Sequence, residues 1–170
     1  MATHEHKAQA PKTVTCAVIT VSDTRTEETD KSGKLIKTLL DEKEHHVGHY
    51  AITKDDYVHI QHLIKDLADR DDIHAILLNG GTGISRRDTT YEAVKDLLDK
   101  EMPGFGEIFR LLSFQNDIGA AAILSRAVAG VYKNTAIFSM PGSSGAVKLA
   151  MNELILPELS HVRFEIEKQL

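Results

Sequence analysis

The sequence contains no tryptophan, a single cysteine, few aromatic residues and no excess of positive charge. Aromatic residues make up 5% of the 170 residues, and 25 acidic side chains outnumber 20 basic ones, which leaves a formal net charge of −5. A nucleic-acid groove needs a basic surface with aromatic stacking partners, so we expect no nucleic-acid partner. Cys16 has no second cysteine with which to form an internal disulfide.

Long apolar runs are also missing from the sequence. No stretch reaches the roughly 20 apolar residues that cross a bilayer, and the N-terminus lacks the apolar segment of a signal peptide. These absences predict a cytoplasmic protein that acts on a small molecule and has no membrane partner. The length of 170 residues predicts one domain, since domains average roughly 150 residues. We expect a flexible N-terminal leader over residues 1–12 and a single domain over residues 13–170.

An alternation of strand and helix patterns organises the rest of the chain. Runs of β-branched and apolar residues predict five strands, over residues 13–21, 47–53, 75–78, 124–131 and 135–140. The last two are separated by a short turn and predict an antiparallel hairpin. Elsewhere, apolar residues recur every three to four positions, which predicts helices. The alternation predicts an α/β fold of three layers, with a mostly parallel sheet flanked by helices.

Polar or glycine-rich segments follow four of the predicted strands. They occupy residues 22–23, 54–55, 79–88 and 141–145. The carboxyl ends of parallel strands meet at one edge of a sheet, and α/β proteins bind ligands at this edge. We therefore expect these four segments to form one ligand site.

The segment of residues 79–88 combines three glycines with charged side chains. The glycines allow the backbone to approach a ligand closely, and Thr89 and Glu92 have the spacing of a capping box that starts a helix. The partial positive charge of a helix N-terminus favours phosphate, and Arg87 adds fork-shaped donors. Asp88 would repel a phosphate unless a cation such as Mg²⁺ lay between them. On the alternative interpretation, Asp88 caps the helix and the glycines only turn the chain.

Residues 141–145 have similar chemistry, with small residues, two hydroxyl groups and a predicted helix behind them. Alone, such a segment is as well explained by helix capping. Together with residues 79–88, it suggests that two anionic groups bind side by side, as when two phosphorylated substrates meet. The motif order argues against a dinucleotide-binding dehydrogenase, whose glycine fingerprint follows the first strand.

Six motifs stand in an order that matches a known family. They occupy residues 21–23, 55, 79–89, 104–107, 124–127 and 140–147. This order resembles the MogA/MoaB family of molybdenum cofactor biosynthesis proteins, of the MoaB type, which is related to the pterin-adenylating domain of gephyrin. The resemblance extends from residue 13 to the C-terminus and implies a molybdopterin-binding-like fold. It also implies transfer of AMP from Mg-ATP to molybdopterin, with ATP as substrate and no permanently bound cofactor.

The resemblance implies roles for individual residues. Asp55 and Asp88 would be the essential carboxylates, which hold Mg²⁺ or orient the reacting phosphates. The residues expected to contact nucleotide and substrate are Ser22, Asp23, Asn79, Gly80, Gly81, Thr82, Gly83, Arg87, Ser125, Pro141, Gly142 and Ser143. Asn79 stands where the family pattern has threonine, and it keeps one hydrogen-bond donor and one acceptor.

The resemblance also implies a homo-oligomer, either a trimer or a hexamer. A non-catalytic protein that binds or assembles molybdopterin on the same fold is the alternative function. The two functions differ in one product, because only the enzyme releases pyrophosphate from ATP.

Overall fold

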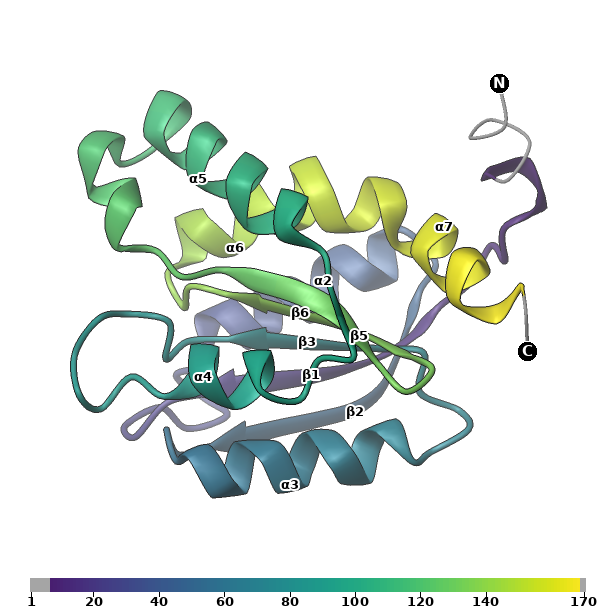
Figure 1. Ribbon diagram of the computed structural model, residues 1–170, viewed down its shortest axis with the longest axis horizontal. Coiled ribbons are helices and arrows are strands. Elements are labelled where there is room, and N and C mark those ends of the chain that lie inside the picture. Colours follow the sequence, from purple (N-terminus) through teal and green to yellow (C-terminus); the bar gives the residue numbers. More distant parts are fainter. Residues whose placement is uncertain (1–6, 169–170) are drawn as a thin grey trace.

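A six-stranded sheet forms the middle layer of the fold (Figure 1). The computed structural model describes residues 7–168 of the chain. The strands are β1 (Thr15–Val21), β2 (His46–Thr53), β3 (Ala75–Asn79), β4 (Lys100–Glu101), β5 (Val128–Tyr132) and β6 (Thr135–Met140). They lie in the order β2-β1-β3-β6-β5-β4, with the first four parallel and with β5 and β4 antiparallel to their neighbours.

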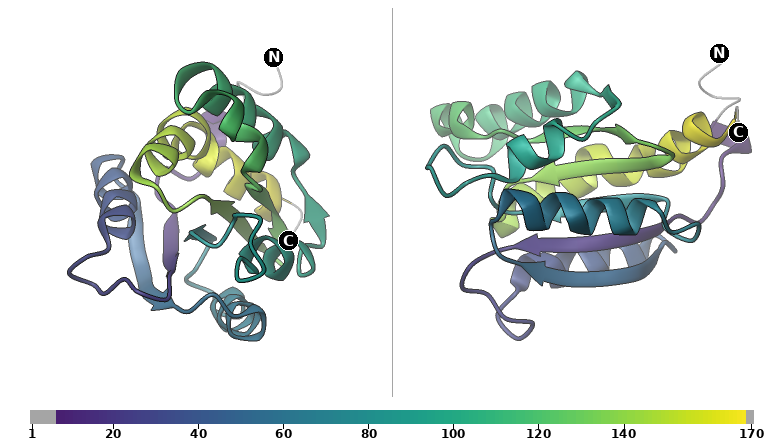
Figure 2. Two further views of the ribbon diagram at one scale, coloured as in Figure 1. Left: turned by 90° about the vertical axis from the view of Figure 1, so that its left-hand side faces the viewer. Right: turned by 60° about the horizontal axis from the view of Figure 1, so that its bottom comes forward.

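Helices cover both faces of this sheet (Figure 2). The helices are α2 (Lys31–Glu42), α3 (Tyr57–Ala68), α4 (Thr90–Lys95), α5 (Pro103–Asn116), α6 (Ser144–Ala150) and α7 (Leu156–Glu167). A 3₁₀ helix, η1 (Gly119–Leu124), follows α5, and a π-helical turn, η2 (Met151–Ile155), joins α6 to α7. The sheet face with α2, α5, α6 and α7 forms one apolar core, and the face with α3 and α4 forms the other. The predicted three-layer α/β fold is confirmed.

The central strand β1 contributes to both cores because successive side chains of a strand point to opposite faces. Cys16 and Val18 belong to the core under α2, whereas Ala17 and Ile19 belong to the core under α3. Such a strand is apolar along its whole length, which explains why the run was recognisable in the sequence. Burial raises the pKa of the Cys16 thiol to about 12, so this cysteine is a packing residue.

The strand predicted over residues 124–131 begins later than expected. The antiparallel hairpin of β5 and β6 is confirmed, but its pairing starts with Val128 opposite Ser139. One residue beyond Ser139, β6 ends at Met140, which would lie opposite residue 127, so residues 124–126 have no strand to pair with. These residues instead continue from η1 and carry Arg126 towards the end of β3.

The predicted N-terminal leader covers residues 1–12, and residues 1–6 lie outside the described range. Residues 7–9 form a helical turn, and Lys7 Nζ donates a hydrogen bond to Glu158 on α7. Among the described residues, no helix is long and apolar enough to cross a membrane.

The four parallel strands end together at one edge of the sheet. Thr20 of β1 lies opposite Asn79 of β3, which in turn lies opposite Met140 of β6, while Val21 pairs with Thr53 of β2. This register brings the segments after all four strands to the same edge. The expected convergence of these segments follows from the parallel pairing.

Candidate functional site

The glycine-rich loop, residues 80–88, leads from β3 to α4. Gly80 and Gly81 have φ angles of 102° and 69°, which favour glycine. A Cβ atom on Gly80 would lie 2.2 Å from the carbonyl oxygen of Val21, and one on Gly81 would lie 2.0 Å from Thr90 Oγ1. Only glycine therefore allows the backbone to lie this close to β1 and α4.

The first half of this loop exposes a row of backbone amides. Within residues 7–168, the N–H groups of residues 81–84 donate no hydrogen bond. The carbonyl oxygens of Thr82 and Gly83, in contrast, accept hydrogen bonds from Arg126. Amides without an acceptor in a glycine-rich turn form a binding site for anions such as phosphate.

Asp55 lies beside the end of the glycine-rich loop. Its Oδ1 atom accepts hydrogen bonds from Thr89 N at 3.0 Å and from Thr89 Oγ1 at 2.7 Å. Burial raises the pKa of Asp55, and the negative charges of Asp88 and Asp23 raise it further, whereas the Thr89 hydrogen bonds lower it. The structure therefore brings together both carboxylates predicted to be essential, with Asp23 as a third.

The predicted capping box at the start of α4 is wrong. The Thr89 hydroxyl donates to Asp55 instead of capping the helix, and α4 begins without a side-chain cap. Glu92, the other member of the predicted box, pairs with Arg126. Both side chains bind partners far away in the sequence, so tertiary contacts replace the local hydrogen bonds of a capping box.

Asp88 and Asp23 each hold part of the site in place. Asp88 Oδ2 accepts hydrogen bonds from Ser85 N at 3.0 Å and Ser85 Oγ at 2.6 Å, which closes the end of the glycine-rich loop. Asp23 Oδ1 accepts from Asp55 N at 3.2 Å, and Asp23 Oδ2 accepts from Arg87. The hydrogen bond from the Asp55 amide lowers the pKa of Asp23, and the positive charge of Arg87 lowers it further.

The carboxylates leave oxygen atoms that fit a divalent cation arriving with phosphate. Within residues 7–168, Asp55 Oδ2 and Asp88 Oδ1 accept no hydrogen bond, and no cluster of three or more acidic, histidine or cysteine side chains could hold a metal alone. Mg²⁺ is commonly bound by one or two carboxylates together with substrate phosphates. Burial and the negative charges of Asp88 and Asp23 raise the pKa of Asp55, and a cation bound beside its carboxylate would lower that pKa.

A cavity of about 300 Å³ lies between the glycine-rich loop, the Pro-Gly loop (residues 141–143) and the α5–η1 segment; we call it the cleft. The predicted residues that line it are Gly81, Thr82, Gly83, Asp88, Ser125, Pro141, Gly142 and Ser143. The Ser125 hydroxyl is buried and has no hydrogen-bond partner, so it is available to a ligand. Asp117 and Ser113 of the α5–η1 side were missed by sequence reasoning, and no motif around them gave a signal.

The Asn79 side chain points into the protein. It is fully buried, and its Nδ2 atom donates to Thr20 Oγ1 at 2.9 Å and to the Ile19 carbonyl at 3.3 Å. Thr20 Oγ1 in turn donates a hydrogen bond to Asp30 Oδ2 at 2.6 Å, so Asn79 is linked to Asp30 through Thr20. Asn79 therefore anchors the start of the glycine-rich loop and does not line the cleft.

Asp30 is a fully buried carboxylate at the N-terminal end of α2. It caps α2 by accepting from Gly33 N at 2.9 Å, and it also accepts from Tyr50 OH at 2.6 Å. Burial alone would raise the pKa of Asp30, but the hydrogen bonds from Thr20, Tyr50 and Gly33 lower it overall. The buried carboxylate thus remains charged.

The Pro-Gly loop is fastened to the segment around Asp30. The Gly142 carbonyl accepts hydrogen bonds from Ser32 Oγ at 2.6 Å and from Arg25 Nη2 at 3.1 Å, while Arg25 Nη1 lies 3.8 Å from Asp30 Oδ1. A Cβ atom on Gly142 would lie 3.1 Å from the Cα atom of Gly80. The two loops are therefore in direct backbone contact.

Three further predicted side chains make contacts outside the cleft or at its border. Ser22 Oγ accepts from Arg25 N at 3.0 Å and so shapes the turn after β1. Ser143 Oγ caps α6 by accepting from Ala146 N at 3.2 Å. The Arg87 side chain is 81% exposed and is paired with Asp23, so its guanidinium is not directed into the cleft.

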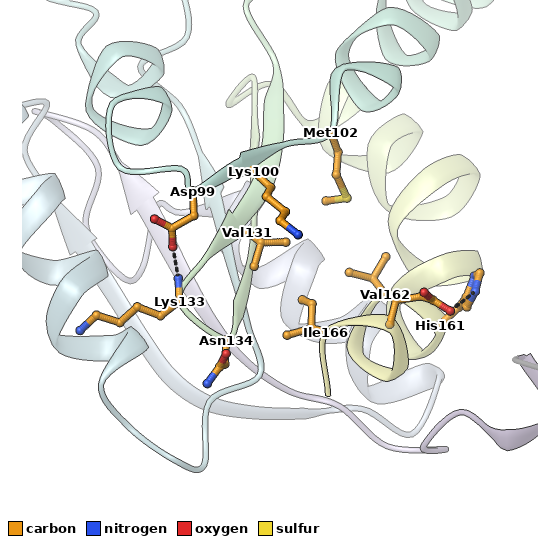
Figure 3. A pocket seen from close by; sticks show the side chains of 10 residues that line it. Asp99, Lys100, Met102, Val131, Lys133, Asn134, His161, Val162 and Ile166 are labelled. Atoms are coloured by element: carbon orange, nitrogen blue, oxygen red, sulfur yellow. Dashed lines mark hydrogen bonds and ion pairs between the residues drawn. The ribbon is translucent and has the colours of Figure 1, made fainter. Parts of the chain in front are cut away.

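A larger cavity, of about 470 Å³, lies at the opposite end of β6 (Figure 3). It is bounded by β5, the β5–β6 turn and α7, with Val131, Val162 and Ile166 forming an apolar wall. Asp99 on its rim accepts a hydrogen bond from Lys133 N at 2.7 Å. None of the predicted site residues lines this cavity.

The mostly parallel sheet, its glycine-rich loop and the row of free amides define an α/β domain with a candidate anion site at its carboxyl edge. Residues 17–161 match the family described as "Probable molybdopterin binding domain". The chain belongs to this family of molybdopterin-binding domains.

Within this family, the chain is most usefully compared with molybdenum cofactor biosynthesis proteins. It is 67% identical over 168 residues to molybdenum cofactor biosynthesis protein B of Halalkalibacterium halodurans, with 99% of each chain covered. A crystal structure of a molybdenum cofactor biosynthesis protein B superposes with a TM-score of 0.92 at 56% identity, covering 95% of this chain and 100% of the other.

A tungsten cofactor synthesizing protein MoaB from Pyrococcus furiosus superposes with a TM-score of 0.79 at 39% identity, covering 91% of this chain and 99% of the other. The resemblance to the MogA/MoaB family is confirmed. The chain is thus a member of a molybdenum cofactor biosynthesis family.

Proposed function

We propose that this protein transfers AMP from Mg-ATP to molybdopterin, which gives adenylylated molybdopterin and releases pyrophosphate. The observation that carries the proposal is the row of amides at residues 81–84, which donate no hydrogen bond within residues 7–168 and belong to a loop lining the cleft. Both substrates present phosphate groups, and phosphate is the ligand that such amides favour.

In this reaction, a phosphate oxygen of molybdopterin forms a bond to the α-phosphorus of ATP, and the bond from that phosphorus to the departing pyrophosphate breaks. The protein contributes positioning and charge stabilisation, without a covalent intermediate. The amides of residues 81–84 would bind phosphoryl oxygens as negative charge develops on them. The buried hydroxyl of Ser125, which also lines the cleft, would donate to a ligand bound there.

Asp55 Oδ2 and Asp88 Oδ1 would hold Mg²⁺, which neutralises the charge of the reacting phosphates when it is bound. The protein's own contribution is to keep these oxygens free of other donors. On Asp55 the Thr89 amide and hydroxyl donate to Oδ1, and on Asp88 the Ser85 amide and hydroxyl donate to Oδ2. Each carboxylate is thus oriented through one oxygen while its other oxygen remains available.

The test is an assay of pyrophosphate release from Mg-ATP in the presence of molybdopterin. Asp88→Asn keeps an oxygen that can accept from Ser85 but removes the negative charge, so we expect release to fall by about 10² or more, the range seen when charge-stabilising groups are lost. Asp96→Asn removes an equally charged side chain outside the cleft and should leave release unchanged.

Undiminished release by Asp88→Asn would remove Asp88 from the mechanism. If the unaltered protein binds molybdopterin tightly but forms no ATP-dependent product, the non-catalytic alternative is correct instead.

The apolar outer surface of α5 and η1 supports the expected homo-oligomer. The exposed apolar side chains on this surface are Ile108, Leu111, Phe114, Ile118, Ile123 and Leu124, each at least 47% exposed. Several large exposed apolar side chains on one segment of the chain favour a surface that associates. Light scattering at micromolar concentration should therefore give a trimer or a hexamer, and a monomer would contradict the proposal.

A further inference from the structure

Arg126 lies between η1 and β5, and all three nitrogens of its guanidinium are used by the protein. Nε donates to the Thr82 carbonyl at 3.3 Å, and Nη2 donates to the carbonyls of Gly83 and Asp88, the latter at 3.2 Å. Nη1 pairs with the Glu92 carboxylate. The guanidinium therefore binds three carbonyl groups of the glycine-rich loop at once.

We propose that Arg126 is a positioning residue that turns the amides of the glycine-rich loop towards the ligand. In a trans peptide, the carbonyl of one residue and the N–H of the next point in opposite directions. No peptide bond among the described residues is cis. Because the carbonyls of Thr82 and Gly83 point to Arg126, the amides of Gly83 and Ile84 point away from it. The inference depends on the proposed function only for the identity of the ligand.

The third carbonyl provides an internal check of this geometry. The carbonyl of Asp88 accepts from Arg126, and the N–H of the same peptide belongs to Thr89. This N–H donates to Asp55 Oδ1 at 3.0 Å. At this peptide, the carbonyl binds Arg126 and the N–H on the opposite side binds the Asp55 carboxylate. The proposal gives the amides of Gly83 and Ile84 the same orientation relative to Arg126.

The position of Arg126 argues against direct ligand binding. Thr82 and Gly83 line the cleft, whereas Arg126 lines a separate cavity of about 330 Å³, to which the next loop residue, Ile84, also contributes. The two cavities have only Asp88 in common among their lining residues. The charge of Arg126 is also already engaged, because Glu92 pairs with it and its guanidinium carbon lies 5.0 Å from the ring centroid of Tyr91.

Lysine can replace the charge of Arg126 but not its fork, because a single ammonium group cannot reach carbonyls bound from two different guanidinium nitrogens in fixed geometry. The informative variants are therefore Arg126→Lys and Arg126→Met. Arg163→Lys is a matched control, since Arg163 also binds a backbone carbonyl, that of Thr13 at 2.8 Å, and a carboxylate, that of Glu167 at 2.8 Å, away from the cleft.

Two measurements test the proposal: calorimetric binding of pyrophosphate in the presence of Mg²⁺, and hydrogen exchange of the Thr89 and Thr90 amides. The Thr89 amide donates to Asp55, and the Thr90 amide donates to the Gly81 carbonyl at 3.2 Å, so both report on the loop. Both Arg126 variants should bind pyrophosphate at least about tenfold more weakly, as expected when hydrogen bonds from a charged group are lost. They should also exchange these two amides faster. Arg163→Lys should match the unaltered protein in both measurements.

Unchanged exchange in the Arg126 variants would overturn the proposal, and so would Arg126→Lys that keeps its pyrophosphate affinity within about twofold, because a point charge would then suffice. If the unaltered protein binds no pyrophosphate, the proposed function loses its support. In that case, the exchange measurement alone decides whether Arg126 orients the loop.

Discussion

The two loops that border the cleft are held by similar contacts but rest on different supports. In the glycine-rich loop, Arg126 binds backbone carbonyls and is balanced by Glu92, which is 47% exposed. In the Pro-Gly loop, Arg25 binds the Gly142 carbonyl and lies near Asp30, which is fully buried. One loop thus depends on contacts near solvent, and the other on a charge inside the fold.

This difference teaches how a protein with a net charge of −5 can present a site for phosphate. Arg25, Arg87 and Arg126 bind carbonyl oxygens or carboxylates of the protein itself. Local positive character is then supplied by the amides of residues 81–84 and, in the proposed reaction, by Mg²⁺. The overall charge of the protein therefore says little about the anions that the cleft accepts.

The largest expected effect is loss of stability when Asp30 is removed. Asp30→Ala leaves the hydroxyls of Thr20 and Tyr50 and the amide of Gly33 without their acceptor, so we expect a loss of about 3–5 kcal/mol in the free energy of unfolding. Urea denaturation measures the loss. Asp96→Ala, which removes an acceptor from an exposed tyrosine, should cost less than about 1 kcal/mol. Equal costs would show that the buried position of Asp30 adds nothing to its contribution to stability.

A smaller loss is expected at the contact between the loops. Gly80→Ala introduces a Cβ atom 2.2 Å from the Val21 carbonyl at a φ angle of 102°, so unfolding should become easier by about 2–3 kcal/mol. Gly104→Ala is the control, because its Cβ atom would meet nothing within 4 Å and the residue lies in α5. This variant should gain up to about 1 kcal/mol. Thermal unfolding should therefore shift in opposite directions for the two glycines.

The Pro-Gly loop should keep its position when one of the two donors to the Gly142 carbonyl is removed. Ser32→Ala removes one of two donors to the Gly142 carbonyl and leaves Arg25 in place, so we expect a cost of about 1 kcal/mol in the free energy of unfolding. Arg25→Ala in addition should cost more than the sum of the single changes, because the carbonyl then has no donor. Simple additivity in urea denaturation would contradict this shared role.

The smallest effect concerns pH and has opposite signs at two carboxylates, Asp55 and Asp30. The pKa of Asp55 is raised in the folded protein, so its contribution to stability is complete below the unfolded value of about 3.9 and is lost as the pH rises through the folded value. Asp55→Asn should therefore stabilise the protein at pH 7, by less than about 1 kcal/mol for a partly exposed charge. The gain should disappear when urea denaturation is repeated below pH 4, an approximate limit set by the unfolded pKa.

Asp30 behaves in the opposite way because its pKa is lowered on folding. Its contribution is present above the unfolded pKa and is lost as the pH falls through the folded value. Acid denaturation of an Asp30→Asn variant should thus be less steep than that of the unaltered protein. An acid limb of the same slope would show that Asp30 does not titrate on unfolding.

Local patterns predicted most of the fold because each depends on neighbouring residues. The apolar run of β1 and the helical spacing of Leu35 and Leu39 identified their elements, and the glycines of residues 80–83 marked the loop after β3. The strand boundary at Val128 was wrong, because it depends on where the partner strand β6 ends. The capping box at Thr89 was wrong because Asp55, 34 residues away, takes its hydroxyl hydrogen bond.

The sequence by itself determined the order of the five longer strands and their helices, the four segments at the carboxyl edge and the family to which the motifs belong, but not the two-residue strand β4. Only the tertiary structure decided that the Asn79 side chain turns inwards, that Asp30 anchors one loop and that Arg126 binds the carbonyls of the other. The physical reason is that helix and strand formation depends on periodic local patterns, whereas a side chain's hydrogen-bond partner depends on which distant segments the fold brings within about 3 Å. The contact between Arg25 and Gly142 spans 117 residues, and no local pattern encodes it.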